Sequence, residues 1–233
     1  MIARDGWTFI LMGLVLTVAV IWLATKWDSQ ALFSVGVLLA LLTLFVVYFF
    51  RDPERSVAND QNMLIAPADG RIVLIDTIPS HAYVGQNTIQ VSTFLSIFDV
   101  HVNRVPASGE VEYVNYHSGK FMAAYHDKAS LENEQTEIGM IVNSGRRIAF
   151  KQIAGLIARR IVCRLSEGDT VTAGGRFGMI KFGSRVDLLV PADSRITVQV
   201  GDHVRGGETV MGYLSGMASS DSTSARERTD AEL

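Results

Sequence analysis

Two long uncharged segments near the N-terminus constrain this chain more than any other feature. Residues 7–24 form a run of 18 residues without a charge, and residues 31–50 form a run of 20. A helix needs about 20 apolar residues to cross the hydrocarbon core of a bilayer, because each residue adds about 1.5 Å. The polar connection between them includes Trp27, a residue type favoured at membrane interfaces. Residues 1–50 are therefore predicted to form a transmembrane helical hairpin.

Three other interpretations compete with this hairpin. A cleaved signal peptide needs a positive start and a small-residue cleavage site, whereas residues 1–6 carry one Arg and one Asp and no Ala-x-Ala motif follows. A buried pair of helices in a soluble protein is disfavoured, because both segments are apolar on all faces. A single span with an interfacial partner stays open, since the first segment is only marginally long.

Positive charges near the two segments predict their orientation. Arg51 and Arg55 follow the second segment and Arg4 precedes the first, while Lys26 lies in the connection. Cytoplasmic flanks carry an excess of Lys and Arg, so the N-terminus and the rest of the chain are expected on the cytoplasmic side of a cell membrane. The single Cys163 cannot form an internal disulfide, in agreement with that compartment.

From residue 63 onward the pattern is that of β-strands. Short runs rich in Val, Ile and Thr alternate with Gly, Pro, Asn and Asp. The expected strands are 71–78, 88–96, 110–116, 136–142, 147–152, 157–165, 177–182, 186–190, 196–200 and 209–214. We predict one mainly β, compact barrel-like or sandwich-like domain over residues 51–217, with helical periodicity at most near 120–134. Residues 218–233 are expected to be a disordered tail.

One short internal repeat stands out. Residues 168–174 and 201–207 share the pattern G-D-x-V-x-x-G at a spacing of 33. Such turns are typical of small barrels that resemble lipoyl and biotinyl carrier domains, and two unrelated hairpin turns explain them equally well.

Charge and ligand spacing argue against several functions. The net charge of −3 and the lack of a basic stripe argue against a nucleic-acid partner. The five histidines and the single cysteine show no metal-ligand spacing, so no metal site is predicted.

The Gly183-Ser184 step lies between two strand-like runs, 177–181 and 186–190. A serine hydroxyl in such a turn can attack the carbonyl of the residue before it, because glycine has no Cβ to block the approach and tolerates strained backbone angles. The resulting ester can undergo β-elimination, which cuts the chain and leaves a dehydroalanine that hydrolyses to a pyruvoyl group. A Gly-Ser turn alone is common, so the surrounding motifs decide its meaning.

Four motifs around this step occur in order. They are VYFFRDPER at 47–55, IAPADGRI at 65–72, FLSIFDVHVNRVP at 94–106 and KFGSR at 181–185. Together they resemble phosphatidylserine decarboxylase, in particular its short membrane-anchored prokaryotic form, from about the second apolar segment to residue 214. No single motif is decisive, but four in this order are specific.

The resemblance implies an enzyme of phospholipid biosynthesis. Its precursor would cleave itself between Gly183 and Ser184, and the large and small chains would remain together as a heterodimer. Ser184 would become a covalent pyruvoyl cofactor that forms a Schiff base with phosphatidylserine and accepts the electrons released by decarboxylation. The product would be phosphatidylethanolamine, and the membrane anchor would keep the lipid substrate close.

The resemblance also suggests catalytic partners for Ser184. Asp69 matches the carboxylate of an Asp-His-Ser relay, and His101 matches the first of two family histidines. Arg104 stands where the family places the second histidine, which is the relay base, and an arginine stays protonated. Either His101 serves both steps or another group activates Ser184; the register favours a role of His101 in decarboxylation. Substrate-binding residues are not predicted.

Two further functions remain as alternatives. The first is a non-catalytic, membrane-anchored carrier or adaptor domain with a lipoyl-like barrel, in which Lys181 would be the modified lysine. The sequence Met179-Ile180-Lys181 matches carrier motifs poorly. A serine hydrolase built on Asp69, His101 and Ser184 would lack the G-x-S-x-G elbow.

Overall fold

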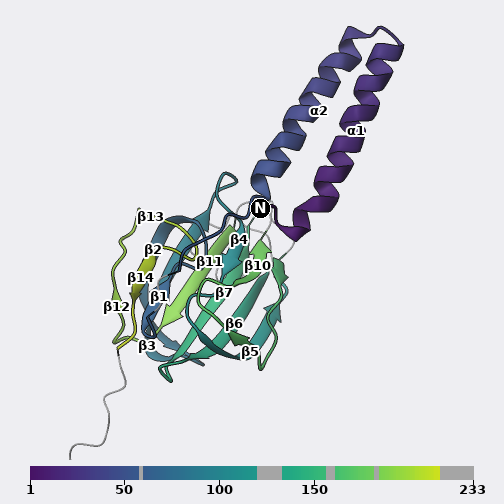
Figure 1. Cartoon of the computed structure of the whole chain (residues 1–233). Helices are drawn as coiled ribbons and strands as arrows, with labels where there is room; N and C mark the ends of the chain where they lie inside the picture. The colour runs from purple at the N-terminus through teal and green to yellow at the C-terminus, as the bar shows by residue number, and fades with distance from the viewer. Residues whose placement is uncertain (58–59, 120–132, 156–160, 181–183, 216–233) are drawn as a thin grey trace, which may run out of the picture.

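The computed structural model describes residues 1–57, 60–119, 133–155, 161–180 and 184–215, and a helical hairpin projects from its β domain (Figure 1). The hairpin consists of α1 (Trp7–Lys26) and α2 (Gln30–Phe49), preceded by the 3-10 turn η1 (Arg4–Gly6). The side chain of Ser29 caps the start of α2, because its Oγ accepts a hydrogen bond from the Leu32 amide.

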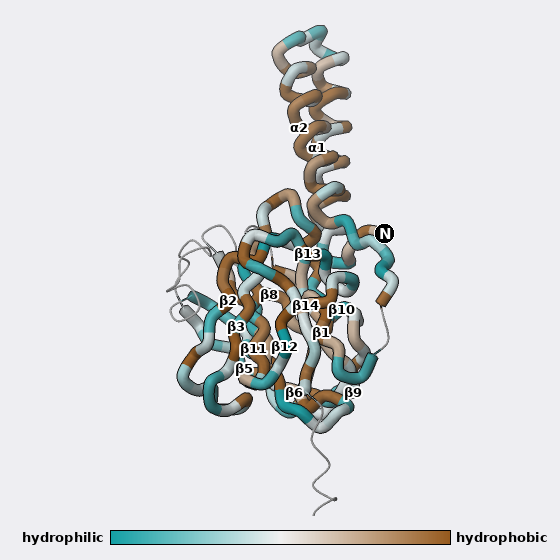
Figure 2. Tube along the Cα trace, turned by 90° about the vertical axis from the view of Figure 1, so that its left-hand side faces the viewer, coloured by the Kyte–Doolittle hydropathy of each residue, from teal (hydrophilic) through white to brown (hydrophobic). Residues whose placement is uncertain are grey.

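Both helices are long and apolar enough to span a bilayer, and only 11% of the most apolar stretch of each is buried. They contact each other through small and hydroxyl side chains: Thr17 Oγ1 and Thr43 Oγ1 lie 3.4 Å apart, and a Cβ at Gly13 would collide with Thr43. Many Leu, Val and Phe side chains of both helices are exposed, and the traces of α1 and α2 are coloured mostly hydrophobic in Figure 2. The expected apolar hairpin is therefore present, and its exposure is unlike that of core helices in a soluble protein.

The described part of the β domain contains three antiparallel sheets. The strands are β1 (Met63–Ile65), β2 (Gly70–His81), β3 (Gly85–Leu95), β4 (Val102–Arg104), β5 (Gly109–His117), β6 (Gln135–Val142), β7 (Arg147–Ala154), β8 (Ile161–Cys163), β9 (Thr170–Val171), β10 (Arg176–Ile180), β11 (Ser184–Val190), β12 (Arg195–Ile196), β13 (His203–Val204) and β14 (Val210–Tyr213). The largest sheet has the order β13-β2-β3-β11-β7-β6-β5-β9, and the smaller ones are β4-β10-β8 and β1-β14-β12. The prediction of a mainly β, barrel-like or sandwich-like domain is confirmed.

The large sheet curls around the main apolar core. Leu188 pairs with Val91 on one side and with Phe150 on the other, so all three side chains point to the same face, where they are fully buried. The curl is strong enough for His81 of β2 to reach Glu137 of β6 at 3.3 Å, although three strands separate β2 from β6.

The structure contains an internal repeat that is longer than the one visible in the sequence. The two G-D-x-V-x-x-G turns contain β9 and β13, which lie at opposite edges of the large sheet. Each edge strand pairs with the start of a long strand, β5 or β2, and both long strands carry a bulge near that start. The long strands follow similar sequences, Pro-Ala-Asp-Gly at 67–70 and Pro-Ala-Ser-Gly at 106–109. Both edges of the large sheet are therefore built in the same way, from a G-D-x-V-x-x-G turn paired with the start of a bulged long strand.

The same hydrogen bond closes each half of this repeat. Asp69 Oδ1 accepts a hydrogen bond from the Gly206 amide at 2.8 Å, and Ser108 Oγ accepts one from the Ala173 amide at 2.9 Å. Asp69 and Ser108 occupy equivalent positions, so one oxygen at this position suffices for the turn. Asp69 differs by carrying a second oxygen and a charge.

Candidate functional site

Ser184 is the first residue of β11, an interior strand of the large sheet. It pairs with Leu95 of β3 on one side and with Ala154 of β7 on the other. Its side chain is fully buried, and its Oγ has no hydrogen-bond partner in the described part of the chain. Leaving a buried hydroxyl without a hydrogen bond costs about 1–3 kcal/mol. A serine at this position is therefore better explained by a functional role than by structural hydrogen bonding. Gly183 and Lys181 lie outside the described residues.

The Ser184 end of the large sheet faces the helical hairpin. Leu95, the partner of Ser184, ends β3, and the following connection touches α2 through Phe98 and Phe45, whose ring centroids lie 6.3 Å apart. An apolar cluster joins the hairpin to the domain at the same end, and its buried members are Ala3, Phe49, Phe50, Val100, Val102 and Met179. The geometry therefore places Ser184 at the hairpin side of the domain.

His101 lies directly before β4 and against the last turn of α2. Its ring centroid is 4.2 Å from that of Phe49, and its side chain is fully buried. Burial lowers the pKa of His101 to about 4, although the hydrogen bond to the Asp99 carbonyl and the Asp99 charge act in the opposite direction. The imidazole is therefore neutral at pH 7.

The carbonyl of Asp99 fixes the tautomer of His101. It lies 3.0 Å from Nδ1, and a carbonyl oxygen only accepts hydrogen bonds, so Nδ1 carries the proton of the neutral ring. Nε2 then holds the free lone pair. This atom is buried and has no hydrogen-bond partner among the described residues. The Nε2 atom of His101 is thus available as a neutral base, because no structural hydrogen bond in the described part of the chain uses it.

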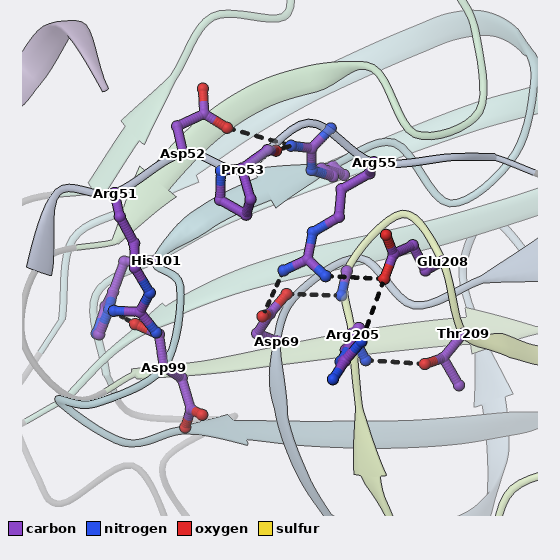
Figure 3. Close-up of polar contacts among 12 residues, drawn as sticks. Arg51, Asp52, Pro53, Arg55, Asp69, Asp99, His101, Arg205, Glu208 and Thr209 are labelled. Atoms are coloured by element: carbon purple, nitrogen blue, oxygen red, sulfur yellow. Dashed lines mark hydrogen bonds and ion pairs between the residues drawn. The ribbon is translucent and has the colours of Figure 1, made fainter. Parts of the chain in front are cut away.

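Asp69 is held by the backbone and by a buried arginine (Figure 3). Its Oδ2 accepts a hydrogen bond from Arg55 Nη2 at 2.8 Å, in addition to the bond between Oδ1 and Gly206, and Arg55 Nη1 also binds Glu208 at 2.9 Å. Burial nevertheless raises the pKa of Asp69, and the Asp99 charge adds to this, while Gly206 and Arg55 lower it. No hydrogen bond links Asp69 to His101 or Ser184 in the described part of the structure.

The side chain of Arg104 makes structural contacts. Its guanidinium donates to Asp52 Oδ1 at 3.1 Å, to the Pro53 carbonyl at 2.8 Å and to the Gly174 carbonyl at 3.0 Å. These contacts connect β4 to the segment that leaves α2. Arg104 therefore links the β domain to the segment that follows the helical hairpin. Its guanidinium is occupied by these structural contacts.

Sequence reasoning missed a buried amide pair between the two sheets near Ser184. Gln152 of β7 lies on the same sheet face as Ser184, two residue pairs along the ladder. Its Nε2 donates to Asn103 Oδ1 at 2.8 Å and to the Val162 carbonyl at 3.3 Å. Because Val162 O only accepts, the orientation of both amides is fixed, and Asn103 Nδ2 is left buried without a partner among the described residues. No motif signals this pair, since an isolated Gln in a strand-like run is usually a surface residue.

Asn133 and Glu134, which directly precede β6, contact the strand next to Ser184. Asn133 Nδ2 donates to the Ala154 carbonyl at 2.7 Å, and the Ala154 amide donates to the Glu134 carbonyl at 2.9 Å. Ala154 is the β7 partner of Ser184. Asn133 and Glu134 therefore hold one of the two strands that frame the serine.

Comparison with known proteins gives a consistent result. The family model described as phosphatidylserine decarboxylase matches residues 42–212. A phosphatidylserine decarboxylase proenzyme of Symbiobacterium thermophilum is 43% identical over 91% of this chain and 95% of its own length. Similar proenzymes of Chlorobium phaeobacteroides and Magnetococcus marinus are 51% identical over 74% of this chain and 80% of their own, and 42% identical over 94% and 98%, respectively. This chain belongs to the phosphatidylserine decarboxylase family.

Proposed function

We propose that this chain is a phosphatidylserine decarboxylase precursor that cleaves itself between Gly183 and Ser184 and then converts phosphatidylserine to phosphatidylethanolamine with release of CO₂. The observation that carries the proposal is the position of Ser184, buried and unpaired at the start of an interior strand, in a chain of this family. The carrier alternative is not favoured, because the family match covers most of the β domain.

The surroundings of Ser184 fit a pyruvoyl group made in place. Once formed, this group supplies an electron-accepting carbonyl. The chain holds position 184 from both sides, through Leu95 and Ala154, and keeps its side chain away from bulk water. Asn103 Nδ2 offers a buried donor between the sheets, and buried donors of this kind stabilise negative oxygen during acyl chemistry.

His101 and Asp69 are the proposed acid–base groups. His101 presents an unprotonated Nε2, and a base must be neutral before it can accept a proton from a hydroxyl. Asp69 contributes a carboxylate whose charge Arg55 balances. His101 and Asp69 both lie within electrostatic reach of Asp99, which perturbs the pKa of each.

The hairpin is proposed to anchor the enzyme in a cell membrane with the β domain on the cytoplasmic side. The two apolar helices support membrane association, and the arginines after α2 support the orientation. A diacyl substrate does not leave the bilayer, so a site at the hairpin end of the domain shortens the path between lipid and Ser184.

Intact-mass analysis tests the cleavage directly. We expect two chains, residues 1–183 and 184–233, with the second blocked at its N-terminus. The chains should co-purify and separate only in denaturant, because β11 keeps its ladder to β3 and β7 after the cut. An active preparation that contains only the uncut 25.5 kDa chain would contradict the proposal.

The low pKa of His101 predicts the pH dependence of self-cleavage. The rate constant is expected to stay level from pH 8 to about 5 and to fall as the pH drops through about 4, because only then is the buried imidazole protonated. An exposed histidine base would already lose activity near pH 6.5. Precursor made by cell-free synthesis can be followed by gel at each pH, with circular dichroism to confirm that it stays folded. A midpoint near 6.5 would remove His101 from this role.

The low pKa of His101 should also make the free energy of unfolding depend on pH, over a range that begins above the fall in cleavage rate. The unfolded chain binds this proton near pH 6.5 and the native protein only near 4, so the free energy of unfolding falls as the pH is lowered between these values.

The internal repeat supplies a structure-preserving test of Asp69. Asp69→Ser keeps one oxygen for the Gly206 amide, as Ser108 does for Ala173, but removes the oxygen that binds Arg55. We expect a folded precursor whose self-cleavage slows by about 10²-fold or more. The matched control is Ser108→Ala, which removes the hydrogen bond from the Ala173 amide in the equivalent turn. This change should lower the free energy of unfolding by about 1 kcal/mol and leave cleavage normal. Normal cleavage of Asp69→Ser would exclude Asp69 from the reaction.

A further inference from the structure

The connection between β3 and β4 exposes two neighbouring apolar side chains. Phe98 is 61% exposed and Ile97 is 36% exposed, although most apolar side chains of the β domain are buried. The connection follows Leu95, the partner of Ser184, and ends at His101. Exposed apolar side chains that lie together often mark an interaction surface, and these two lie close to the proposed reactive serine.

This connection is built rigidly against the last turns of α2. The Phe98 carbonyl accepts hydrogen bonds from Arg51 Nη2 at 2.6 Å and from Tyr48 Oη at 3.2 Å. The Arg51 guanidinium also lies over the Tyr48 ring, 3.9 Å from its centroid. Inside the connection, Asp99 Oδ2 accepts from both the amide and the hydroxyl of Ser96, at 2.8 and 2.7 Å. The backbone therefore holds Ile97 and Phe98 in place.

The contact with α2 sets the depth of Phe98 relative to a bilayer. Its ring packs edge-on against Phe45, which lies four residues, or about 6 Å along the axis, before the end of α2 at Phe49. If α2 crosses the bilayer, a side chain that touches Phe45 lies at or below the level of the lipid headgroups. Tyr48 and Arg51, which hold the connection, are residue types that favour this interface.

We propose that Ile97 and Phe98 form a third membrane contact, inserted into the lipid interface beside the helical hairpin. The occupant of this apolar surface is the acyl and headgroup boundary of the bilayer. The contact holds the Ser184 end of the large sheet against the membrane surface, where a phosphatidylserine headgroup can reach it without the lipid leaving the bilayer. This inference rests on the proposed membrane anchoring by α1 and α2.

A depth measurement on the full-length, processed protein tests the contact. Phe98→Cys, in a Cys163→Ala background, is labelled with an environment-sensitive fluorophore, and the protein is reconstituted into phosphatidylcholine–phosphatidylglycerol vesicles. The matched control is Asn143→Cys, an exposed position in the turn that enters β7 at the end opposite Ala154, roughly 25 Å away. A third label at Leu38, which is 66% exposed in α2, reports the anchor itself.

Blue-shifted emission and quenching by nitroxide lipids at position 98, with neither at position 143, would support the contact. Quenching at position 38 without quenching at position 98 would overturn it while leaving the anchor intact. Absence of quenching at position 38 would overturn the membrane anchoring and this inference with it.

A kinetic arm separates membrane docking from chemistry. In Ile97→Ser/Phe98→Ser, the backbone bonds to Arg51 and Tyr48 can remain, because they use the Phe98 carbonyl. We expect the apparent KM for phosphatidylserine in vesicles to rise on the order of tenfold, while kcat on short-chain phosphatidylserine below its micelle concentration stays unchanged. An unchanged KM on vesicles, or an equal loss on both substrates, would contradict a docking role.

Discussion

Replacing Ser184 by alanine is expected to leave one uncut chain that releases no CO₂ from phosphatidylserine. No hydroxyl remains to attack the carbonyl of residue 183, so neither the cut nor the new carbonyl at position 184 can form. The domain should fold as well as the wild type, because the lost Oγ has no hydrogen-bond partner among the described residues. Gel analysis, intact mass and CO₂ release measure the three expectations separately.

The matched control for this change is Ser194→Ala. Ser194 is another buried serine whose Oγ has no partner in the described structure, and it lies beyond the opposite end of β11. This variant should cleave completely and retain full turnover. If Ser184→Ala were cut at residue 183 or decarboxylated the lipid, Ser184 would have no place in the mechanism.

Replacing His101 by alanine is expected to slow self-cleavage by about 10²–10⁴-fold, the usual contribution of a positioned general base. The fixed tautomer leaves Nε2 as a buried lone pair, and Arg104, at the position of the family's second histidine, is committed to Asp52 and two carbonyls. Pulse-labelled precursor followed by gel gives the rate. His203→Ala is the matched control, because His203 is exposed and lies beside Arg71.

A second result for His101→Ala has a different meaning. Normal cleavage, a carbonyl at position 184 that a hydrazide can label, and little phosphatidylethanolamine would confine His101 to decarboxylation. That division of labour is the one favoured by the sequence register alone. Normal cleavage together with normal turnover would remove His101 from both reactions.

The hairpin and the β domain could be predicted, and the start of a strand at Ser184 could be located, because their signals are local. Apolar runs of helical length and short Val- and Ile-rich runs between turn residues depend only on neighbours in the chain. Ser184 likewise stands at the border of two such runs, and its strand begins there. The family motifs supplied the substrate, which no local pattern contains.

The contacts around the site could not be predicted because they join residues that are distant in sequence. Gln152 reaches Asn103 across 49 positions, and Arg55 reaches Glu208 across 153. The strand of three residues that contains Asn103 is too short for any periodicity to show. A salt bridge is the plainer expectation for Arg104, but its partners could not be identified from the sequence. They are Asp52, in the segment after α2, and two backbone carbonyls.

If Ser184 becomes the cofactor as proposed, the interior position of β11 ties the supply of cofactor to protein synthesis. Ser184 begins a strand that is paired over its length with β3 and along most of it with β7, so the small chain made by the proposed cleavage could not be exchanged without opening the sheet. Under the proposed mechanism, each folded molecule would carry one reactive carbonyl for its lifetime and would need none from a metabolite pool. A carbonyl lost to a side reaction could not be reloaded from solution, so the capacity to make this lipid would follow the number of newly folded chains.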